Sequence, residues 1–282
     1  MLKPSNFGTW IFFALNAAVF AGVSWLIDPG LVVPAIWLYV IINVIVLSPV
    51  GEAIMCAEIG AKRIVRKDMQ LKIIPNLEVV LEKALDQTPT LTRNIRLKII
   101  HDQAPNALAV GRRTICITDG VLDLPDEAIM GLLAHEVGHL ANKHTDIQLL
   151  IGGGNIFITG FILILRIISW IVAGISGILA WKSRSCAIGC LMGIVGAFTV
   201  AVVWLWTKFC MLFLTWSKRK NEFAADKYAS KIGFGNELAY ALDSIGVVYP
   251  REQMLKALYS THPDVHERIG RLQEMGASYS RY

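Results

Sequence analysis

The 282-residue chain is strongly apolar, with 54% hydrophobic and only 17% charged residues. Soluble domains average roughly 45–50% apolar and about 25% charged residues, so this composition indicates an integral membrane protein with a modest polar domain. The formal net charge of +5 is small, and no block of Lys and Arg is long enough for a nucleic-acid-binding patch. The composition therefore argues against nucleic acid as a partner and favours the lipid bilayer.

The five cysteines include no Cys-x-x-Cys pair, and their number is odd. This pattern does not favour a disulfide framework or a cysteine-based metal site. We expect buried, unreactive thiols in a reducing compartment. The cysteines are Cys56, Cys116, Cys186, Cys190 and Cys210.

Two uncharged stretches, at residues 9–27 and 31–50, open the chain. Each approaches the length of about 20 apolar residues that crosses a bilayer. The Asp-Pro-Gly sequence at 28–30 is typical of a tight turn. No small-residue cleavage site clearly ends the first stretch, so we expect a retained span rather than a signal peptide. Residues 1–50 are therefore predicted to form a transmembrane hairpin.

Basic residues gather after the second apolar stretch, and an excess of Lys and Arg beside a span marks its cytoplasmic end. They are Lys62, Arg63, Arg66, Lys67 and Lys72. A plain solvated helix face would look the same and agrees with the same side of the membrane. We therefore expect residues 51–146 to form the first part of a cytoplasmic domain.

Within this domain, apolar spacing predicts a helix at residues 76–86 and a strand at 95–100. Residues 108–110 and 114–118 are typical of two strands around a turn. An exposed strand here could border a cleft and pair with an extended peptide through its backbone. An ordinary hairpin without a ligand fits the spacing equally well, so both interpretations stay open.

The sequence His135-Glu136-Val137-Gly138-His139 lies in a predicted helix that begins at Pro125. Imidazoles four residues apart on a helix share one face and can hold one zinc ion, while the intervening Glu can take a proton from the attacking water. This spacing is typical of zinc metallopeptidases, although chance also produces it. His144 comes five residues after His139, and we expect it on a different face, as a surface histidine.

Residues 147–165 and 185–207 are again uncharged and long enough to cross a bilayer. We therefore predict a second transmembrane hairpin at residues 147–216. Arg166 and the Lys182-Ser-Arg184 sequence fit this interpretation poorly, because basic residues are unfavourable inside a span and uncommon on the outer side. The limits of the third and fourth spans therefore stay open.

A catalytic zinc site usually has three protein ligands and one open position. Glu222 is the best candidate for the third ligand, and Asp226 follows four residues later on the same helical face, where it could accept a hydrogen bond from a ligating His. A solvated acidic face is the alternative. Two spans between His135 and Glu222 would return the chain to the same side of the membrane, so residues 217–282 are predicted to complete the catalytic domain.

The expected chemistry is metal-assisted hydrolysis of an amide bond, with Glu136 passing a proton from water to the leaving amine. The tetrahedral oxyanion needs a hydrogen-bond donor, and His262 and Arg268 are the candidates. His262 beside Pro263 is equally consistent with a loop histidine, and Arg268 with a helix-surface cation. The sequence leaves these alternatives open.

Several motifs together resemble the HtpX-type membrane metallopeptidases of the M48 family, relatives of the CAAX prenyl protease Ste24. The resemblance covers nearly the whole chain, including two N-terminal and two later spans. Its motifs are HEVGH at 135–139, Glu222-Phe-Ala-Ala-Asp226, Ser260-Thr-His-Pro263 followed by Glu267-Arg268, and Asn106-Ala-Leu-Ala-Val-Gly111 with Thr118-Asp-Gly-Val-Leu122. The family's loop often has His-Pro-Pro, whereas Asp264 follows Pro263 here.

The resemblance implies a mainly α-helical integral membrane protein of the α+β type. About four transmembrane helices would carry a gluzincin-like zinc-metallopeptidase domain with a small β-sheet at the cleft. One Zn²⁺ ion per subunit would be held by His135, His139 and Glu222, with Glu136 as the catalyst. The expected substrate-binding strand carries Asn106, Ala107, Leu108 and Ala109.

The activity implied by the resemblance is cytoplasmic proteolysis of misfolded membrane proteins or other unfolded polypeptides at the bacterial inner membrane. Two other classes stay open. In an intramembrane zinc protease the His pair would lie inside a span, which the polar residues around the motif disfavour. In a non-enzymatic, partner-binding membrane protein the motif would be fortuitous and no zinc would be bound.

Overall fold

The structure is a computed structural model that describes residues 7–146, 219–248 and 264–280, together with the helical residues 149, 167, 170, 171, 174, 204 and 205. The chain forms two compact units. One contains residues 1–36 and 151–216, and the other contains residues 37–150 and 217–282. The predicted hairpin at 147–216 lies almost entirely outside the described residues, so it stays a prediction.

Two helices stand where the sequence predicts the N-terminal hairpin, α1 (Phe7–Ile27) and α2 (Val32–Val46). In the turn between them, the Asp28 carboxylate accepts a hydrogen bond from the Gly30 N–H at 2.8 Å. Among the described residues, one helical stretch, Pro29–Val46, is long and apolar enough to cross a membrane.

The second helix ends four residues before the predicted limit at Val50. Ser48 caps the N-terminus of a separate helix, α3 (Pro49–Glu58), and its hydroxyl accepts a hydrogen bond from the Val50 N–H at 3.2 Å. Because the uncharged stretch runs through this boundary, hydropathy could not detect it.

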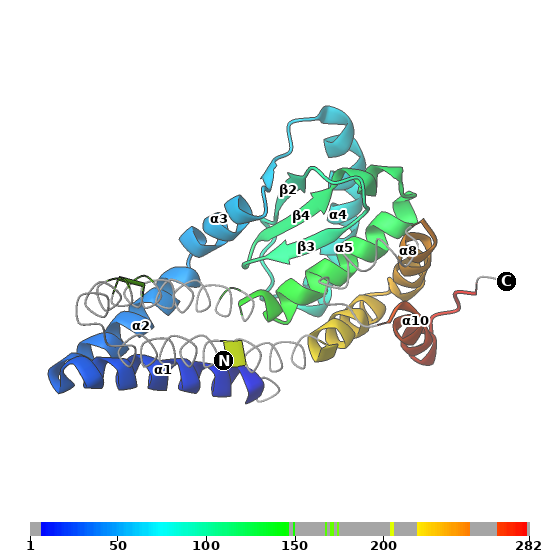
Figure 1. The fold of residues 1–282 in the computed structure, drawn as a ribbon. Helices are drawn as coiled ribbons and strands as arrows, with labels where there is room; N and C mark the ends of the chain where they lie inside the picture. The colour runs from blue at the N-terminus through cyan, green and yellow to red at the C-terminus, as the bar shows by residue number, and fades with distance from the viewer. Residues whose placement is uncertain are drawn as a thin grey trace. The chain divides into compact units, whose positions relative to one another are not determined.

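A four-stranded sheet follows, with the strand order β1-β2-β4-β3. Its strands are β1 (Lys62–Arg63), β2 (Arg96–Ile100), β3 (Ala107–Val110) and β4 (Thr114–Thr118). β3 and β4 pair as an antiparallel hairpin, which confirms the prediction, and Gly111 in their turn has a φ of +61° that favours glycine. β3 lies at the edge of the sheet (Figure 1). β1 was not predicted, because two exposed residues show no strand periodicity.

Helices pack on one face of the sheet and form the main hydrophobic core with it (Figure 1). They are α4 (Lys67–Gln87), α5 (Asp126–Ala141), the helical residues 219–231, α8 (Gly235–Val248) and α10 (Val265–Glu274). Helix α4 begins nine residues before the predicted start at Asn76. Pro75 lies inside the helix on its exposed side and does not end it.

Two glycines of α5 let neighbouring helices approach its backbone. A Cβ added at Gly138 would lie 2.9 Å from the Ala225 carbonyl oxygen, and one added at Gly131 would overlap the backbone of Glu237. Residues 219–231 and α8 therefore pack against α5 at a separation that any side chain would increase.

We expect Gly138→Ala to destabilise the fold by about 1–3 kcal/mol, since overpacking forces backbone shifts. Thermal unfolding of the purified protein measures this effect. Gly270→Ala on α10 is the matched control, because its added Cβ would meet no atom within 4 Å, and it should leave the stability unchanged or slightly raised. Equal stability of the two variants would contradict the close packing of α5 and residues 219–231.

Candidate active site and metal centre

Helix α5 presents the two histidines of the HEVGH motif on one face, both buried. Pro125 precedes its first turn, and Asp126 and Glu127 lie in that turn, where acidic side chains favour the helix dipole. The Nε2 atoms of His135 and His139 lie 3.2 Å apart, and their rings are nearly perpendicular at 89°. Helical spacing thus brings the two nitrogens together as predicted.

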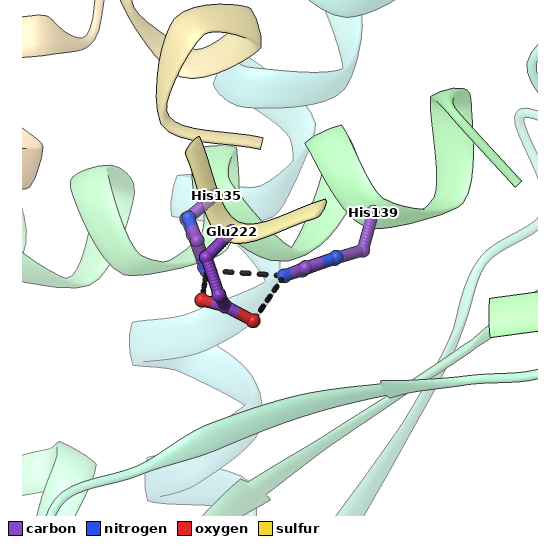
Figure 2. Close-up of side chains that lie close together, drawn as sticks. All are labelled: His135, His139 and Glu222. Atoms are coloured by element: carbon purple, nitrogen blue, oxygen red, sulfur yellow. Dashed lines mark hydrogen bonds and ion pairs between the residues drawn. The ribbon is translucent and has the colours of Figure 1, made fainter. Parts of the chain in front are cut away.

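Glu222, on the helical residues 219–231, completes the cluster (Figure 2). Its Oε2 lies 3.2 Å from the Nε2 of His135, and its Oε1 lies 3.4 Å from the Nε2 of His139. All three side chains are buried and could hold one metal ion together. The three predicted ligands therefore meet at one point, although they come from distant parts of the sequence.

The separations within this cluster suit a tetrahedral ion. With bonds of about 2.0–2.1 Å to nitrogen and oxygen, the ligands of a tetrahedral zinc lie about 3.3–3.4 Å from one another. The two Nε2 atoms lie 3.2 Å apart, and each lies 3.2 or 3.4 Å from a different oxygen of Glu222, so each contact is close to this value. The donor set of two imidazoles and one carboxylate is also one that catalytic zinc sites use.

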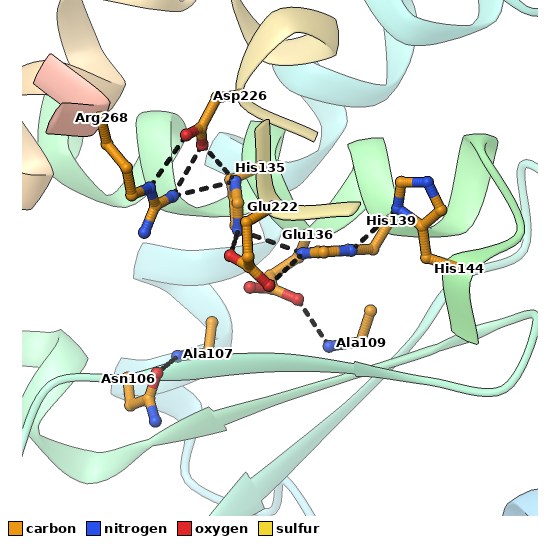
Figure 3. Close-up of polar contacts among 10 residues, drawn as sticks. All are labelled: Asn106, Ala107, Ala109, His135, Glu136, His139, His144, Glu222, Asp226 and Arg268. Atoms are coloured by element: carbon orange, nitrogen blue, oxygen red, sulfur yellow. Dashed lines mark hydrogen bonds and ion pairs between the residues drawn. The ribbon is translucent and has the colours of Figure 1, made fainter. Parts of the chain in front are cut away.

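The outer nitrogen of His135 is Nδ1, the ring nitrogen that does not face Glu222 and His139, and a buried ion pair holds it (Figure 3). Its Nδ1 lies 2.8 Å from Asp226, which also accepts hydrogen bonds from Arg268 on α10 at 2.7 and 2.9 Å. Burial alone would raise the pKa of Asp226, but its bonds to His135 and Arg268 lower it to about 2. Asp226 is therefore an ionised acceptor, as the sequence analysis proposed for this residue.

The cluster attracts positive charge. Burial and the nearby Arg268 would lower the pKa of His135, yet the hydrogen bonds with Asp226 and Glu222 outweigh them and raise it to about 9. The carboxylates therefore favour a cation beside the imidazole. A bound metal ion would satisfy the same preference.

His144 is not on the surface, and that prediction is wrong. The residue is buried, and its Nδ1 lies 3.2 Å from the Nδ1 of His139. Helix α5 ends at Ala141, and Lys143 then takes a left-handed conformation with φ at 58°. Because helical spacing no longer applies after this turn, His144 returns to the outer side of His139. Asn142, a residue type that often ends helices, was the available signal.

Glu136 faces the edge of the sheet (Figure 3). Its buried Oε2 accepts a hydrogen bond of 2.6 Å from the Ala109 N–H of β3. On the same strand, the Ala107 N–H donates to the side-chain oxygen of Asn106 at 2.9 Å. The side chain of Leu108 instead packs with a second cluster around Cys56. The predicted substrate strand therefore contacts the predicted catalytic residue.

The remaining candidates differ in outcome. Arg268 is buried against Asp226, and its guanidinium also lies 3.3 Å from the Nδ1 of His135. It is therefore not the solvated surface cation that the sequence left possible. His262 lies outside the described residues.

A family model described as Peptidase family M48 matches residues 75–276. The chain belongs to peptidase family M48. It is thus a metallopeptidase, and the non-enzymatic alternative is wrong. Among the described residues, the one span-length stretch, Pro29–Val46, does not contain the HEVGH motif, which disfavours the intramembrane alternative.

Curated relatives named "Protease HtpX homolog" share a quarter to a third of their aligned residues with this M48 chain. The protein of Syntrophobacter fumaroxidans is 29% identical over 212 residues, covering 64% of this chain and 70% of the relative. That of Syntrophotalea carbinolica is 31% identical over 209 residues, with the same coverage. That of Persephonella marina is 28% identical over 247 residues, covering 73% of this chain and 80% of the relative.

The solved structure of S. mikatae Ste24p is similar in fold. The similarity has a TM-score of 0.50 at 19% identity and covers 94% of this chain and 66% of that one. The M48 chain therefore shares the Ste24p fold but spans less than two thirds of that protein. This likeness supports the architecture alone.

We expect His144→Ala to weaken metal binding by about 10–100-fold, the usual effect of removing a residue that orients a ligating His. Competition with a chelator of known affinity measures the loss. His101→Ala, which removes an exposed histidine paired with Asp119, should leave metal affinity unchanged. Identical affinities of the two variants would show that His144 does not orient His139.

Proposed function

We propose that this M48 chain is a zinc-dependent endopeptidase in which His135, His139 and Glu222 hold the ion. The observation that carries this proposal is the buried convergence of two Nε2 atoms and the two oxygens of one carboxylate, with contacts of 3.2–3.4 Å. Without a metal, the carboxylate favours a proton on His135, and a bound cation would take the place of that proton. A bound zinc ion activates water and polarises the scissile carbonyl.

Glu136 is the proposed general base and acid. It follows His135 directly, and its carboxylate is buried beside the ligand cluster and fixed by the Ala109 N–H. In this position it can take a proton from the attacking water and deliver it to the leaving amine. The bond from Ala109 keeps one carboxylate oxygen oriented while the other stays available for the proton.

The edge of β3 is the proposed substrate-binding strand. In the antiparallel β3–β4 hairpin, Leu108 pairs with Cys116, and Asn106 accepts a hydrogen bond from the Thr118 N–H. The backbone groups of Ala107 and Ala109 therefore point away from β4. The N–H groups of Ala107 and Ala109 already donate to Asn106 and Glu136. An extended peptide could donate hydrogen bonds to the carbonyl groups of these two residues and would lie beside Glu136.

Three residues have proposed positioning roles. Asp226 and His144 would orient the outer nitrogens of His135 and His139, which fixes the ring nitrogens that face the metal. Arg268 would hold Asp226 through two hydrogen bonds. Because these bonds use two of the three guanidinium nitrogens, we propose His262 rather than Arg268 as the donor to the oxyanion.

The proposed biological role is removal of misfolded membrane proteins or other unfolded polypeptides. The names of the HtpX relatives support a protease, and a multi-pass location in a bacterial inner membrane agrees with the apolar composition. The basic residues after α2 support a cytoplasmic catalytic domain.

Glu136→Gln should lower kcat by about 10²–10⁴-fold, the range that general acid–base catalysis supplies. The amide preserves the side-chain size and can still accept the Ala109 hydrogen bond, so metal content should stay at the wild-type level. Cleavage of an unfolded polypeptide by the purified protein, with metal analysis of the same samples, measures both. Wild-type cleavage by this variant would remove Glu136 from the mechanism.

Removing the metal with a chelator should abolish cleavage, and added zinc should restore it in the wild-type chain. Glu222→Ala should fail to recover, because one of three ligands is missing, whereas Glu82→Ala on the exposed side of α4 should recover fully. Activity that survives complete metal removal would contradict the proposed function.

A further inference from the structure

Helix α3 has an apolar face that the described protein does not cover. Val50 and Ile54, four residues apart, are 56% and 52% exposed, and Ala53 and Ala57 beside them are exposed as well. No charged residue lies on this side of the helix before Glu58 at its end. Large apolar side chains in such a stripe typically mark an interaction surface.

The opposite face of α3 fixes this orientation. Cys56 is buried against Val110 and Cys116 of the sheet. The buried carboxylate of Glu52 accepts hydrogen bonds from the Thr114 hydroxyl and, at 3.2 Å, from the Arg112 N–H. Helix α3 is therefore locked to the β3–β4 hairpin, and its apolar face must point outward.

The same hairpin turn is held a second time. The Arg112 guanidinium donates two hydrogen bonds to the buried Asp146, at 2.9 and 3.1 Å. Glu52 comes shortly after α2, and Asp146 directly precedes the apolar stretch at 147–165. Two of the three points where the chain is predicted to change between apolar stretch and polar domain are thus tied to the turn that ends β3.

Two observations indicate what covers the face. Its apolar surface continues from α2, whose second half belongs to the same compact unit. A group of exposed basic residues follows the helix: Lys62, Arg63, Arg66 and Lys67. A bilayer with anionic headgroups offers both an acyl boundary and negative charge, which is what an apolar helix with basic neighbours binds.

We propose that the outward face of α3, formed by Val50, Ala53, Ile54 and Ala57, lies in the interfacial layer of an anionic membrane. Through the Glu52 and Asp146 bonds, this contact holds β3 at the bilayer surface. A polypeptide that emerges from the membrane would then meet the edge strand first. This last step rests on the proposed function of β3, whereas the membrane contact of α3 does not.

Spin labels on Ile54→Cys and Val50→Cys test the contact in the full chain, reconstituted into vesicles of phosphatidylcholine and phosphatidylglycerol. Oxygen concentrates in the acyl layer, and a nickel chelate stays in water. We expect high collision rates with oxygen at both positions and nickel rates several-fold lower than at Glu82→Cys, an exposed site on α4. The wild-type chain, labelled in parallel, gives the background from its own cysteines.

High nickel rates at both positions would mean that the face is in water and would overturn the proposal. Low rates with both reagents would also overturn it, because they indicate cover by protein, such as a second copy of the chain. Metal content and cleavage of a soluble unfolded polypeptide are measured on the same samples. If cleavage is lost while the oxygen rates stay high and the nickel rates low, the result contradicts the proposed function alone. If cleavage persists while the nickel rates are high, the result contradicts the membrane contact alone.

Discussion

The structure depends on a deficit of positive charge in the buried cluster around α5. Glu136, Glu222 and Asp226 bring three carboxylates to this cluster, and among the residues that the structure describes Arg268 is the one buried arginine or lysine beside them. Charges out of water are tolerated only when they are paired. A divalent metal ion between His135, His139 and Glu222 would supply the two missing positive charges. The same deficit explains why the pKa of His135 rises to about 9 despite burial.

Small residues make this concentration of acceptors possible. Gly138 lets the backbone of Ala225 approach α5, which brings Glu222 and Asp226 within reach of the histidines. On the other side, the small side chains of Ala107 and Ala109 are buried in the core beneath Glu136. The chemistry of the site thus depends on positions that carry almost no side chain.

Sequence patterns predicted the parts of the fold that follow regular periodicity. The four-residue spacing of His135 and His139 predicted that both imidazoles lie on one face of α5, and the strand pattern predicted the β3–β4 hairpin. The family-level resemblance agreed with Glu222, which spacing alone could not have connected to α5. The third and fourth predicted spans lie almost entirely outside the described residues, and His262 lies outside them, so they stay predictions.

Three of the errors share a physical cause, because each occurs where a single residue decides whether the helix continues or ends. Ser48 begins a new helix inside an uncharged stretch, and α4 continues through Pro75. Lys143 adopts a left-handed conformation and redirects His144. Such features depend on one residue and its tertiary contacts. Hydropathy and periodicity are judged over many residues, so they do not detect these features.

The error at His144 also explains how the two ligating histidines differ. An arginine cannot accept a hydrogen bond, so the Nδ1 of His135 donates to the charged Asp226. If the Nε2 of His139 faces a metal, its Nδ1 must donate as well, and His144 accepts with its own Nδ1 while its proton is on Nε2. A carboxylate at position 144 could accept the same bond but would add a negative charge that one divalent ion could not neutralise. A neutral imidazole orients His139 and leaves the charge of the cluster unchanged.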